Sequence, residues 1–381
     1  MINQWDIRSI GLLLILGTFT FSCTSPGDRQ PEPSTDEPVL SIEEALPPTE
    51  EVLPPIEKVL LPTERPLIPT EETVPIIWDD DGSLDGVTAL LYLLQHPSYE
   101  VKAATISPGI AHPDVFAPNL VKFLASLGVE GIQVAAGREQ PLSGDNAFPD
   151  QWRLDSDEFW GLDLPDGGEP TDDRNAAQLI VDVIKASEQP VTVFVGGPLT
   201  NLAEALRMDP TIKDGIRSLE IMGGAVNVPG NVFLAGPDPL PAEWNIYIDP
   251  VAASEVFSSG LHIRLNPLDA TDRIRWSHDD ANTWGNSNSP ESSIATQLLT
   301  NAFWTQKTFT VLIWDLVAAI NAADRDLCEW QELFVEVVLE ETDNQGQIVV
   351  IGDQGANVSA CMIPDRAAYK NAAQQMFGTP P

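Results

Sequence analysis

The sequence predicts an α/β fold, in which an open, mostly parallel (mixed) sheet carries helices on both faces. Short apolar runs alternate along the chain with segments in which apolar residues recur at helical spacing. Several of the apolar runs end in acidic or glycine-rich clusters, and a helical segment begins directly after them. Strands and helices that alternate in this way build parallel sheets, and such sheets bind ligands at the carboxyl ends of their strands.

The strands are predicted from runs that are rich in β-branched residues and too short for helices. The first run stops at an acidic stretch, and the run that ends at Met222 stops at two glycines. In chain order the predicted strands cover 74–78, 99–106, 132–135, 191–195, 218–222 and 262–267.

The helices are predicted from apolar residues spaced three or four apart, as at Val87, Leu90, Leu91 and Leu94. In chain order they cover 87–94, 115–127, 176–186, 199–208 and 250–258. The stretch 146–160 is aromatic without this periodicity, so we expect a loop there that forms a wall or lid of a binding site.

Residues 1–23 have the pattern of an export signal. Arg8 precedes an apolar run over 10–21, which is too short for a membrane-spanning helix but suits a signal-peptide core. The sequence Thr20-Phe21-Ser22-Cys23 is similar to a bacterial lipoprotein cleavage site, although threonine replaces its usual leucine. We therefore expect Cys23 to be lipidated and to anchor an envelope lipoprotein on its periplasmic or extracellular face. Plain secretion and an uncleaved anchor are the alternatives.

Residues 24–73 are predicted to be a disordered linker rich in proline and glutamate. Proline lacks a backbone donor and favours extended polyproline II structure, and motifs such as Leu-Pro-Pro-Thr-Glu recur through this stretch. Such a linker is a stiff spacer that would hold the domain at 74–381 away from a membrane. A peptide-docking role is the alternative.

The charge balance excludes one class of partner. The chain has 57 acidic and 20 basic residues, and its formal net charge is -37. Because binding to phosphate backbones needs a basic surface, we expect no nucleic-acid partner.

Besides Cys23 the chain has two cysteines, Cys328 and Cys361. In an exported protein they can form a disulfide, and two buried free thiols are the alternative. Their spacing is not typical of a metal-binding motif.

The segment Asp79-Asp80-Asp81-Gly82-Ser83-Leu84-Asp85-Gly86 follows the first predicted strand. So many carboxylates at the end of a buried strand would repel one another unless a cation lay among them. Hard oxygen ligands suit calcium or magnesium. A helix N-cap accounts for one or two of these acids but not for all of them. The segment therefore predicts a divalent metal site.

Polar clusters also follow later strands. Gly196-Gly197-Pro198-Leu199-Thr200-Asn201 follows one strand, Gly223-Gly224 and Gly230-Asn231 follow another, and Ala242-Glu243-Trp244-Asn245 comes next. In an extended segment Glu243 and Asn245 would point to the same side, where a carboxylate and an amide suit the hydroxyls of a sugar. Helix capping and a polar strand face are the alternatives.

Asp315 lies within an apolar helical segment that has no lysine or arginine nearby in sequence. Because a buried acid needs a partner, a metal ion is one explanation for this residue.

Together these clusters resemble the inosine–uridine preferring nucleoside hydrolases from about Val74 to the C-terminus. That family begins with an Asp-x-Asp-x-x-x-Asp-Asp loop, of which Asp79, Asp81 and Asp85 match the first three acids. Gly-Pro-Leu-Thr-Asn, Met-Gly-Gly, Gly-Asn and Glu-x-Asn-x-x-x-Asp-Pro then follow in the family's order, at 197–201, 222–224, 230–231 and 243–250. A late aspartate of the family matches Asp315. The resemblance implies a Rossmann-like nucleoside hydrolase fold.

The resemblance also implies residue roles. Asp81 would bind calcium and act as the catalytic base that takes a proton from the attacking water. The implied calcium ligands are Asp81, Asp79, the backbone carbonyl of Thr200 and Asp315. The implied ribose-binding residues are Asp85, Asn231, Glu243 and Asn245. They would hold the sugar as it flattens toward an oxocarbenium ion, whose positive charge carboxylates favour.

The sequence departs from the family pattern at three places. Gly86 replaces the fourth loop acid, and Asp79, Asp80 or water would have to compensate. Trp314 replaces a histidine that protonates the leaving base in many members. Trp314, Trp304 or Trp244 would instead stack on the base, and the alternative is that Trp314 only fills the core.

The third departure is Ile110, which replaces an asparagine that often contacts the sugar. His112 is the candidate substitute, as a substrate contact or proton donor, and a surface-loop histidine is the alternative.

We therefore expect a calcium-dependent enzyme that hydrolyses the N-glycosidic bond of purine or pyrimidine ribonucleosides to ribose and free base. The alternative is a nucleoside- or ribose-binding lipoprotein with weak or no turnover, because Gly86 and Trp314 depart from the pattern. The resemblance also implies a homo-oligomer, since related enzymes are commonly dimers or tetramers.

Overall fold

The computed structural model describes residues 73–378, apart from 167–174, 235–237, 288, 307 and 353. The predicted signal, Cys23 and the linker up to residue 72 lie outside the described residues. The described residues belong to one compact unit, Leu67–Pro381. None of the helices described in this unit is both long and apolar enough to cross a membrane.

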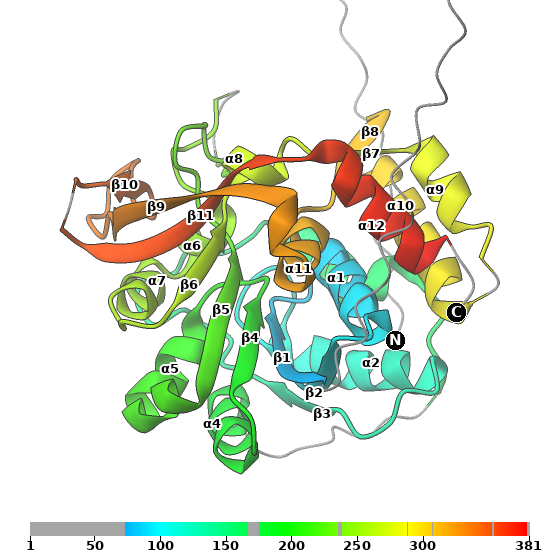
Figure 1. Ribbon diagram of the computed structural model, residues 1–381, viewed down its shortest axis with the longest axis horizontal. Coiled ribbons are helices and arrows are strands. Elements are labelled where there is room, and N and C mark those ends of the chain that lie inside the picture. Colours follow the sequence, from blue (N-terminus) through cyan, green and yellow to red (C-terminus); the bar gives the residue numbers. More distant parts are fainter. Residues whose placement is uncertain are drawn as a thin grey trace, which may run out of the picture. The chain divides into compact units, whose positions relative to one another are not determined.

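The described residues form a nine-stranded sheet (Figure 1). In spatial order its strands are β10 (Ile348–Val350), β9 (Cys328–Val337), β11 (Ala356–Pro364), β6 (Ile263–Asn266), β5 (Ile216–Met222), β4 (Val191–Val195), β1 (Val74–Asp80), β2 (Tyr99–Ile106) and β3 (Gln133–Ala136). Neighbouring strands from β11 to β3 run parallel, and β9 pairs antiparallel with both β10 and β11. The predicted α/β fold with a mostly parallel, mixed sheet is therefore confirmed.

The order of the strands reverses between β1 and β4. The chain moves outward from β1 to β2 and β3, and then returns to the other side of β1 to form β4, β5 and β6. In open parallel sheets a crevice forms at the carboxyl ends of the two strands at such a point. The acidic segment follows β1 and the Gly196–Asn201 cluster follows β4, so both lie at this crevice.

Helices cover both faces of the sheet (Figure 1). One apolar core contains Ile76 and Trp78 of β1, and the other contains Ile77, because successive residues of a strand point to opposite faces. The first core packs α1 (Leu84–Gln95), α2 (Pro113–Ser126), α9 (His278–Trp284), α10 (Pro290–Gln306), α11 (Trp314–Ala323) and α12 (Arg366–Phe377). The second packs α4 (Ala176–Ala186), α5 (Thr200–Met208) and α7 (Pro250–Phe257).

The smaller elements lie in the connections. They are α3 (Asp150–Asp157), η1 (Phe159–Gly161), η2 (Pro210–Gly215), α6 (Trp244–Ile248), α8 (Leu268–Thr271), β7 (Arg275–Ser277), β8 (Thr310–Leu312) and η3 (Arg325–Leu327). The prediction of a loop throughout 146–160 was wrong, because α3 begins after Pro149, whose carbonyl accepts the backbone N–H of Trp152 at 2.9 Å. The residues of α3 lack the apolar periodicity from which a helix is predicted.

The predicted strands and helices of the sheet region appear with bounds that differ by a few residues at most. Cys328 at the start of β9 and Cys361 in β11 form a disulfide, with 5.7 Å between their Cα atoms. Of the two alternatives that the sequence left open, the structure therefore has the disulfide, which joins the two antiparallel strands beside the parallel part of the sheet.

Candidate active site

A cavity of about 390 Å³ opens at the carboxyl ends of β1, β4 and β5. Polar side chains that the sequence singled out line it together with a set of aromatic residues. The lining includes Asp81, Ser83, Asp85, Gly196, Met222, Asn231, Glu243, Asn245, Asp272, Trp314 and Asp315, and also Ile110, Phe148, Trp152, Phe233 and Trp244. Its volume suits a small molecule.

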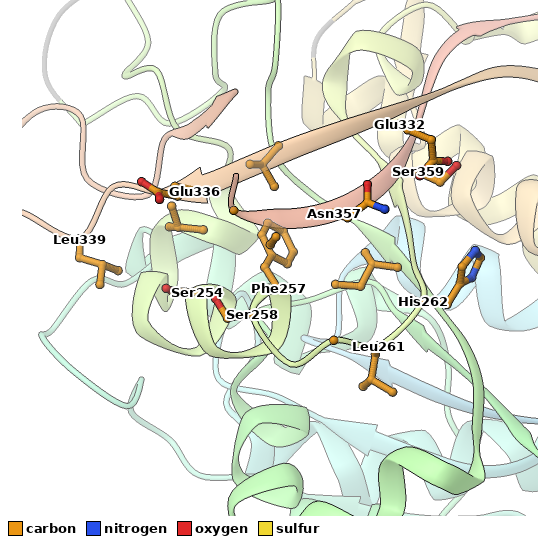
Figure 2. A pocket seen from close by; sticks show the side chains of 16 residues that line it. Ser254, Phe257, Ser258, Leu261, His262, Glu332, Glu336, Leu339, Asn357 and Ser359 are labelled. Carbon is orange, nitrogen blue, oxygen red and sulfur yellow. The ribbon is translucent and has the colours of Figure 1, made fainter. Parts of the chain in front are cut away.

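A larger hollow of about 900 Å³ lies elsewhere, between α7 and the strands β6, β9 and β11 (Figure 2). Its polar side chains, such as His262, Glu332 and Asn357, are exposed and spread along its length. Because no buried acids converge on this hollow, we place the chemistry in the smaller cavity despite the difference in size.

Backbone hydrogen bonds fix the acidic segment on the sheet. The carbonyl of Asp79 accepts from Gly196 N at 2.8 Å, that of Asp80 from Ser107 N at 2.8 Å, and that of Asp81 from Ala111 N at 2.9 Å. The loops after β2 and β4 therefore hold this segment from both sides. These backbone hydrogen bonds hold Asp81 at the edge of the cavity.

The Asp81 side chain is buried and faces the cavity, with 2% of its surface exposed. Its Oδ2 accepts from Ile110 N at 3.1 Å, whereas its Oδ1 has no hydrogen-bond partner. Burial, together with the charges of Asp85 and Glu243, raises the pKa of Asp81 to about 8. A carboxylate with a free oxygen and a pKa near neutrality can accept a proton.

Asp85 and Ser83 connect the acidic segment to α11. Asp85 Oδ2 accepts from the backbone N–H of Trp314 at 3.0 Å and of Asp315 at 3.3 Å. The Ser83 hydroxyl donates to Asp315 Oδ2 at 3.0 Å and also caps α1 by accepting from Gly86 N at 2.8 Å. Asp315 therefore lies beside the acidic segment, although more than 200 residues separate them in sequence.

Glu243 and Asn245 lie at the start of α6, and the prediction of an extended segment here was wrong. Glu243 is the N-cap, and its carboxylate accepts from the backbone N–H groups of Gly224, Asn245 and Ile246. These bonds satisfy free N–H groups at the helix start, which explains why α6 begins here. Burial raises the pKa of Glu243 to about 7.

The amide groups beside Glu243 are oriented by the backbone. Asn245 Nδ2 donates to the carbonyls of Gly196 at 3.0 Å and Met222 at 3.1 Å, which leaves its Oδ1 as an acceptor. Asn231 Oδ1 accepts from Trp244 N at 3.0 Å. Both amides and Glu243 line the cavity, so they form one polar wall.

Aromatic side chains line the cavity as well. Phe148 stacks on Trp244 with 4.4 Å between ring centroids, and Trp152 contacts both rings. The aromatic wall predicted from 146–160 thus lies at the cavity, on α3 and the segment before it. The Trp314 indole N–H donates to Asp272 Oδ1 at 2.8 Å, which fixes the ring at the cavity.

The model of the family described as inosine-uridine preferring nucleoside hydrolase matches residues 76–371. The chain belongs to this family. It is accordingly a hydrolase of N-glycosyl compounds. The match covers all the strands of the sheet except the first residues of β1, and it includes every residue that lines the cavity.

Relatives of this nucleoside hydrolase include enzymes named pyrimidine-specific ribonucleoside hydrolase RihA. The enzyme from Salmonella newport is 35% identical over 229 residues, which are 59% of this chain and 70% of the relative. The enzyme from Escherichia coli O1:K1 is 34% identical over 229 residues, which are again 59% of this chain and 70% of the relative.

Solved structures have the same fold. A plant nucleoside hydrolase has a TM-score of 0.72 and 24% identity, over 81% of this chain and all of that one. The inosine-uridine preferring nucleoside hydrolase of Bacillus anthracis has a TM-score of 0.68 and 23% identity, over 80% of this chain and 99% of that one.

Three residues with implied roles do not line the cavity of this nucleoside hydrolase. Asp79 is buried, and its Oδ1 accepts from Thr105 Oγ1 at 2.7 Å and Asn201 Nδ2 at 2.8 Å. The Thr200 hydroxyl donates to Asp249 Oδ2 at 2.7 Å, which fixes the start of α5. His112, at the start of α2, lies 2.7 Å from Asp157 Oδ2 through its Nδ1. Trp304 has a side chain outside the described residues.

The acids at the cavity, together with the buried Asp80 at the end of β1, fit a divalent cation by their chemistry. Asp80 Oδ2, Asp81 Oδ1 and Asp315 Oδ1 are buried oxygens without hydrogen-bond partners. Burial and mutual repulsion raise the pKa of both Asp80 and Asp315 well above the ordinary value. Within the described residues, no three acid, histidine or cysteine side chains are spaced as a complete metal cage. Each of the unpartnered oxygens nevertheless needs a proton or a cation nearby, which favours a cation among these acids.

Sequence reasoning missed Asp272, Ser83 and Met222 as cavity residues. Ser83 carried a signal, since a serine before a helical segment is typical of an N-cap. Asp272 directly follows the short helix α8, which begins just after the carboxyl end of β6, and polar residues in such connections deserve consideration. Met222 is the last residue of a predicted strand and has no polar signature.

Proposed function

We propose that this enzyme hydrolyses the N-glycosidic bond of ribonucleosides to ribose and free base, with Asp81 as the general base and calcium as the cofactor. The observation that carries the proposal is that Asp81, Asp85, Glu243 and Asn245 converge on one cavity that also has an aromatic wall. The polar groups suit the hydroxyls of ribose, and the aromatic rings suit the flat base.

The residues around the sugar would favour the transition state. The N-glycosidic bond breaks as the ribose ring gains positive charge, and carboxylates beside the ring stabilise that charge. Asp85 and Glu243 supply negative charge at this wall, and the Asn245 Oδ1 accepts a sugar hydroxyl. Their backbone hydrogen bonds hold them in place, so little reorganisation is needed during the reaction.

Asp81 would take the proton of the attacking water at its free Oδ1. When bound, calcium would supply positive charge that lowers the pKa of that water. Asp81 and Asp315, with the backbone carbonyl of Thr200, would hold the ion. Positive charge among these acids would also lower their pKa values, which keeps Asp81 deprotonated and able to act as a base.

The test is an assay of ribose release by the full chain from a panel of purine and pyrimidine nucleosides. The panel includes uridine and cytidine because the RihA relatives are named pyrimidine-specific. We expect release that needs calcium, stops with chelator and falls by about 1,000-fold in Asp81→Ala. The exposed Asp114→Asn, at the start of α2, is the matched control and should keep full activity.

The same assay decides between turnover and binding alone. A folded, calcium-loaded protein that releases no ribose from any nucleoside would overturn the enzymatic proposal for these substrates. If nucleosides then raised its melting temperature without turnover, the protein would be a nucleoside-binding member of the family. Sedimentation of the active protein would test the implied homo-oligomer.

We also propose that the protein is an exported lipoprotein, in which residues 1–23 are the signal, Cys23 is lipidated and residues 24–73 are the linker to the catalytic domain. The support is the sequence pattern alone, because these residues up to 72 lie outside the described part. Radiolabelled palmitate should be incorporated into the wild-type chain in bacteria and not into Cys23→Ser. Equal labelling of both would exclude lipidation at Cys23.

A further inference from the structure

The side chain of Asp80, in the acidic segment, has no role in the proposed function above. It is fully buried at the end of β1 and does not line the cavity. Its Oδ1 accepts from the backbone N–H groups of Gly82 at 2.8 Å and Ser83 at 3.1 Å, whereas its Oδ2 has no hydrogen-bond partner. A buried carboxylate oxygen without a donor is costly unless a proton or a cation lies beside it.

Two glycines make room for this carboxylate. A Cβ atom added at Gly86 would lie 2.2 Å from Oδ1 and 2.1 Å from Oδ2 of Asp80. A Cβ atom at Gly196 would lie 2.2 Å from the same Oδ2 and 3.2 Å from Asp315 Cγ. The Asp80 carboxylate therefore fills the space that a side chain at position 86 would enter, and its free oxygen lies toward Asp315.

Gly86 is the position at which the acidic segment lacks the fourth acid of its family pattern. A carboxylate at position 86 and one at position 80 would need the same space, so the structure accommodates one of them. We propose that Asp80 is a calcium ligand of this hydrolase and delivers from β1 the carboxylate that position 86 lacks. This inference rests on the calcium site of the proposed function.

The direction of the side chain supports this assignment. Successive residues of β1 point to opposite faces of the sheet, and Asp79 points toward Thr105 and Asn201. Asp80 therefore points to the face that carries α1 and α11, where Asp315 also lies. The free oxygen of Asp80 and the carboxylate carbon of Asp315 both lie within 3.2 Å of the Cβ position of Gly196, so a side chain at that position would lie between the two carboxylates.

The test measures calcium binding rather than turnover, by titration calorimetry and thermal unfolding of the full chain freed of metal. Asp80→Asn should bind calcium about 100-fold more weakly, since it loses a charged ligand. Its metal-free form should melt at or above the metal-free wild type, because asparagine cannot ionise near Asp81 and Asp315. The rise in melting temperature with calcium should shrink accordingly.

Asp269→Asn is the matched control. Asp269 is equally buried and accepts two backbone N–H groups, from Val226 and Asn227 at 2.8 Å each, and both of its oxygens have partners. This variant should keep wild-type calcium affinity. A loss of affinity as large as that of Asp80→Asn would mean that any buried acid supports binding, and would overturn the assignment.

Moving the carboxylate from position 80 to position 86 gives a sharper test. Asp80→Ala combined with Gly86→Asp should bind calcium within about tenfold of the wild type, whereas Asp80→Ala alone should not. Wild-type affinity in Asp80→Asn, or no recovery in the double variant, would overturn the inference. Calcium binding that depends on Asp80 in a protein without nucleoside turnover would leave the inference intact and overturn the proposed function instead.

Discussion

Asp85 at the start of α1 accepts a hydrogen bond from the backbone N–H of Trp314 at the start of α11, with 3.0 Å between Oδ2 and N. The first N–H groups of a helix have no partner within it, and α11 has no side-chain cap of its own. Asp85 therefore holds the helix that carries Asp315 against the acidic segment. One carboxylate thus has both a structural contact and a place on the cavity wall.

These two roles of Asp85 can be separated by substitution. In Asp85→Asn the amide oxygen can still accept from Trp314, so the melting temperature should stay at or above that of the wild type. The lost charge should lower kcat/KM for nucleosides by about 100-fold. Asp85→Ala should lose the acceptor too, and about 1 kcal/mol of unfolding free energy with it. Thermal unfolding and steady-state kinetics measure the two effects.

If Asp85→Asn were as unstable as Asp85→Ala, the contact with α11 would depend on charge and not on the oxygen acceptor. If instead Asp85→Asn kept full kcat/KM, Asp85 would have no part in the reaction.

Glu243 should distinguish ribonucleosides from nucleosides that lack one sugar hydroxyl. A hydrogen bond from a sugar hydroxyl to a carboxylate increases binding affinity by about 10- to 100-fold. We expect the wild type to favour ribonucleosides over the matching 2′-deoxy or 3′-deoxy compound, and Glu243→Gln to reduce that preference. Glutamine keeps an oxygen acceptor for the N–H groups at the start of α6. An unchanged preference in a folded Glu243→Gln would place the sugar elsewhere.

Features that depend on residues close together in the chain could be predicted from the sequence, whereas features that depend on distant residues could not. The buried strands could be predicted because β-branched runs such as 191–195 lie between turn signals. The Thr200–Asn201 segment could be predicted because a helix begins there. The segment of α6 was predicted to be extended, since the side chains of Trp-Asn-Ile-Tyr-Ile alternate in character as they do in a strand. Its helical state is explained by backbone bonds to Glu243, including one from Gly224, which only the folded chain brings close.

Many of the residues that the sequence singled out for the site line the cavity, but the sequence did not show how they are arranged. Spacing alone does not place Asp315 beside Ser83, because the contact crosses 232 positions. Asp315 was assigned to the site because the order of the motifs resembles that of the family. No motif indicated that the Asp80 side chain would fill the space beside Gly86, since this depends on how closely α1 approaches β1.

Trp314 should contribute to binding the base rather than to proton transfer. Its ring lines the cavity and its indole N–H is bound to Asp272. Trp314→Ala should raise KM for nucleosides by about 3- to 10-fold, the range expected for loss of one aromatic contact, with a smaller change in kcat. Trp330→Phe is the matched control, because that indole also donates a hydrogen bond, to Arg325, outside the cavity. A loss confined to kcat, with the pH profile changed, would contradict the binding role.

The disulfide between Cys328 and Cys361 should stabilise the part of the sheet formed by β9 and β11. It closes a loop with a sequence separation of 33. Its removal in Cys328→Ala with Cys361→Ala should cost about 2–4 kcal/mol of unfolding free energy. Denaturant unfolding with and without reductant measures this, and the double variant should not respond to reductant. Because the disulfide lies outside the cavity lining, kcat should be unchanged below the melting temperature. A wild type that is equally stable in reductant would contradict this role.

The stability of the metal-free protein should fall as pH rises from about 5 to about 8. Burial raises the pKa of Asp79 and Glu243 to about 7 and that of Asp81 to about 8, above the ordinary value for a carboxyl group. Between the unfolded and folded pKa values the folded state binds more protons than the unfolded state. Unfolding free energy must then decrease with pH, by up to about 1.4 kcal/mol per pH unit for each group.

The stabilising effect of these protons is complete below the unfolded pKa and is lost as pH passes the folded pKa of each group. Melting temperatures from pH 4.5 to 8.5 in chelator measure the slope, to which Asp80 and Asp315 contribute as well as these three groups, because their pKa values are also raised. Asp81→Asn should flatten the part near pH 8. Saturating calcium should reverse the trend, because deprotonated carboxylates bind the cation and protons compete with it. A metal-free wild type that becomes more stable over this range would show that these acids are ionised in the folded state without a cation.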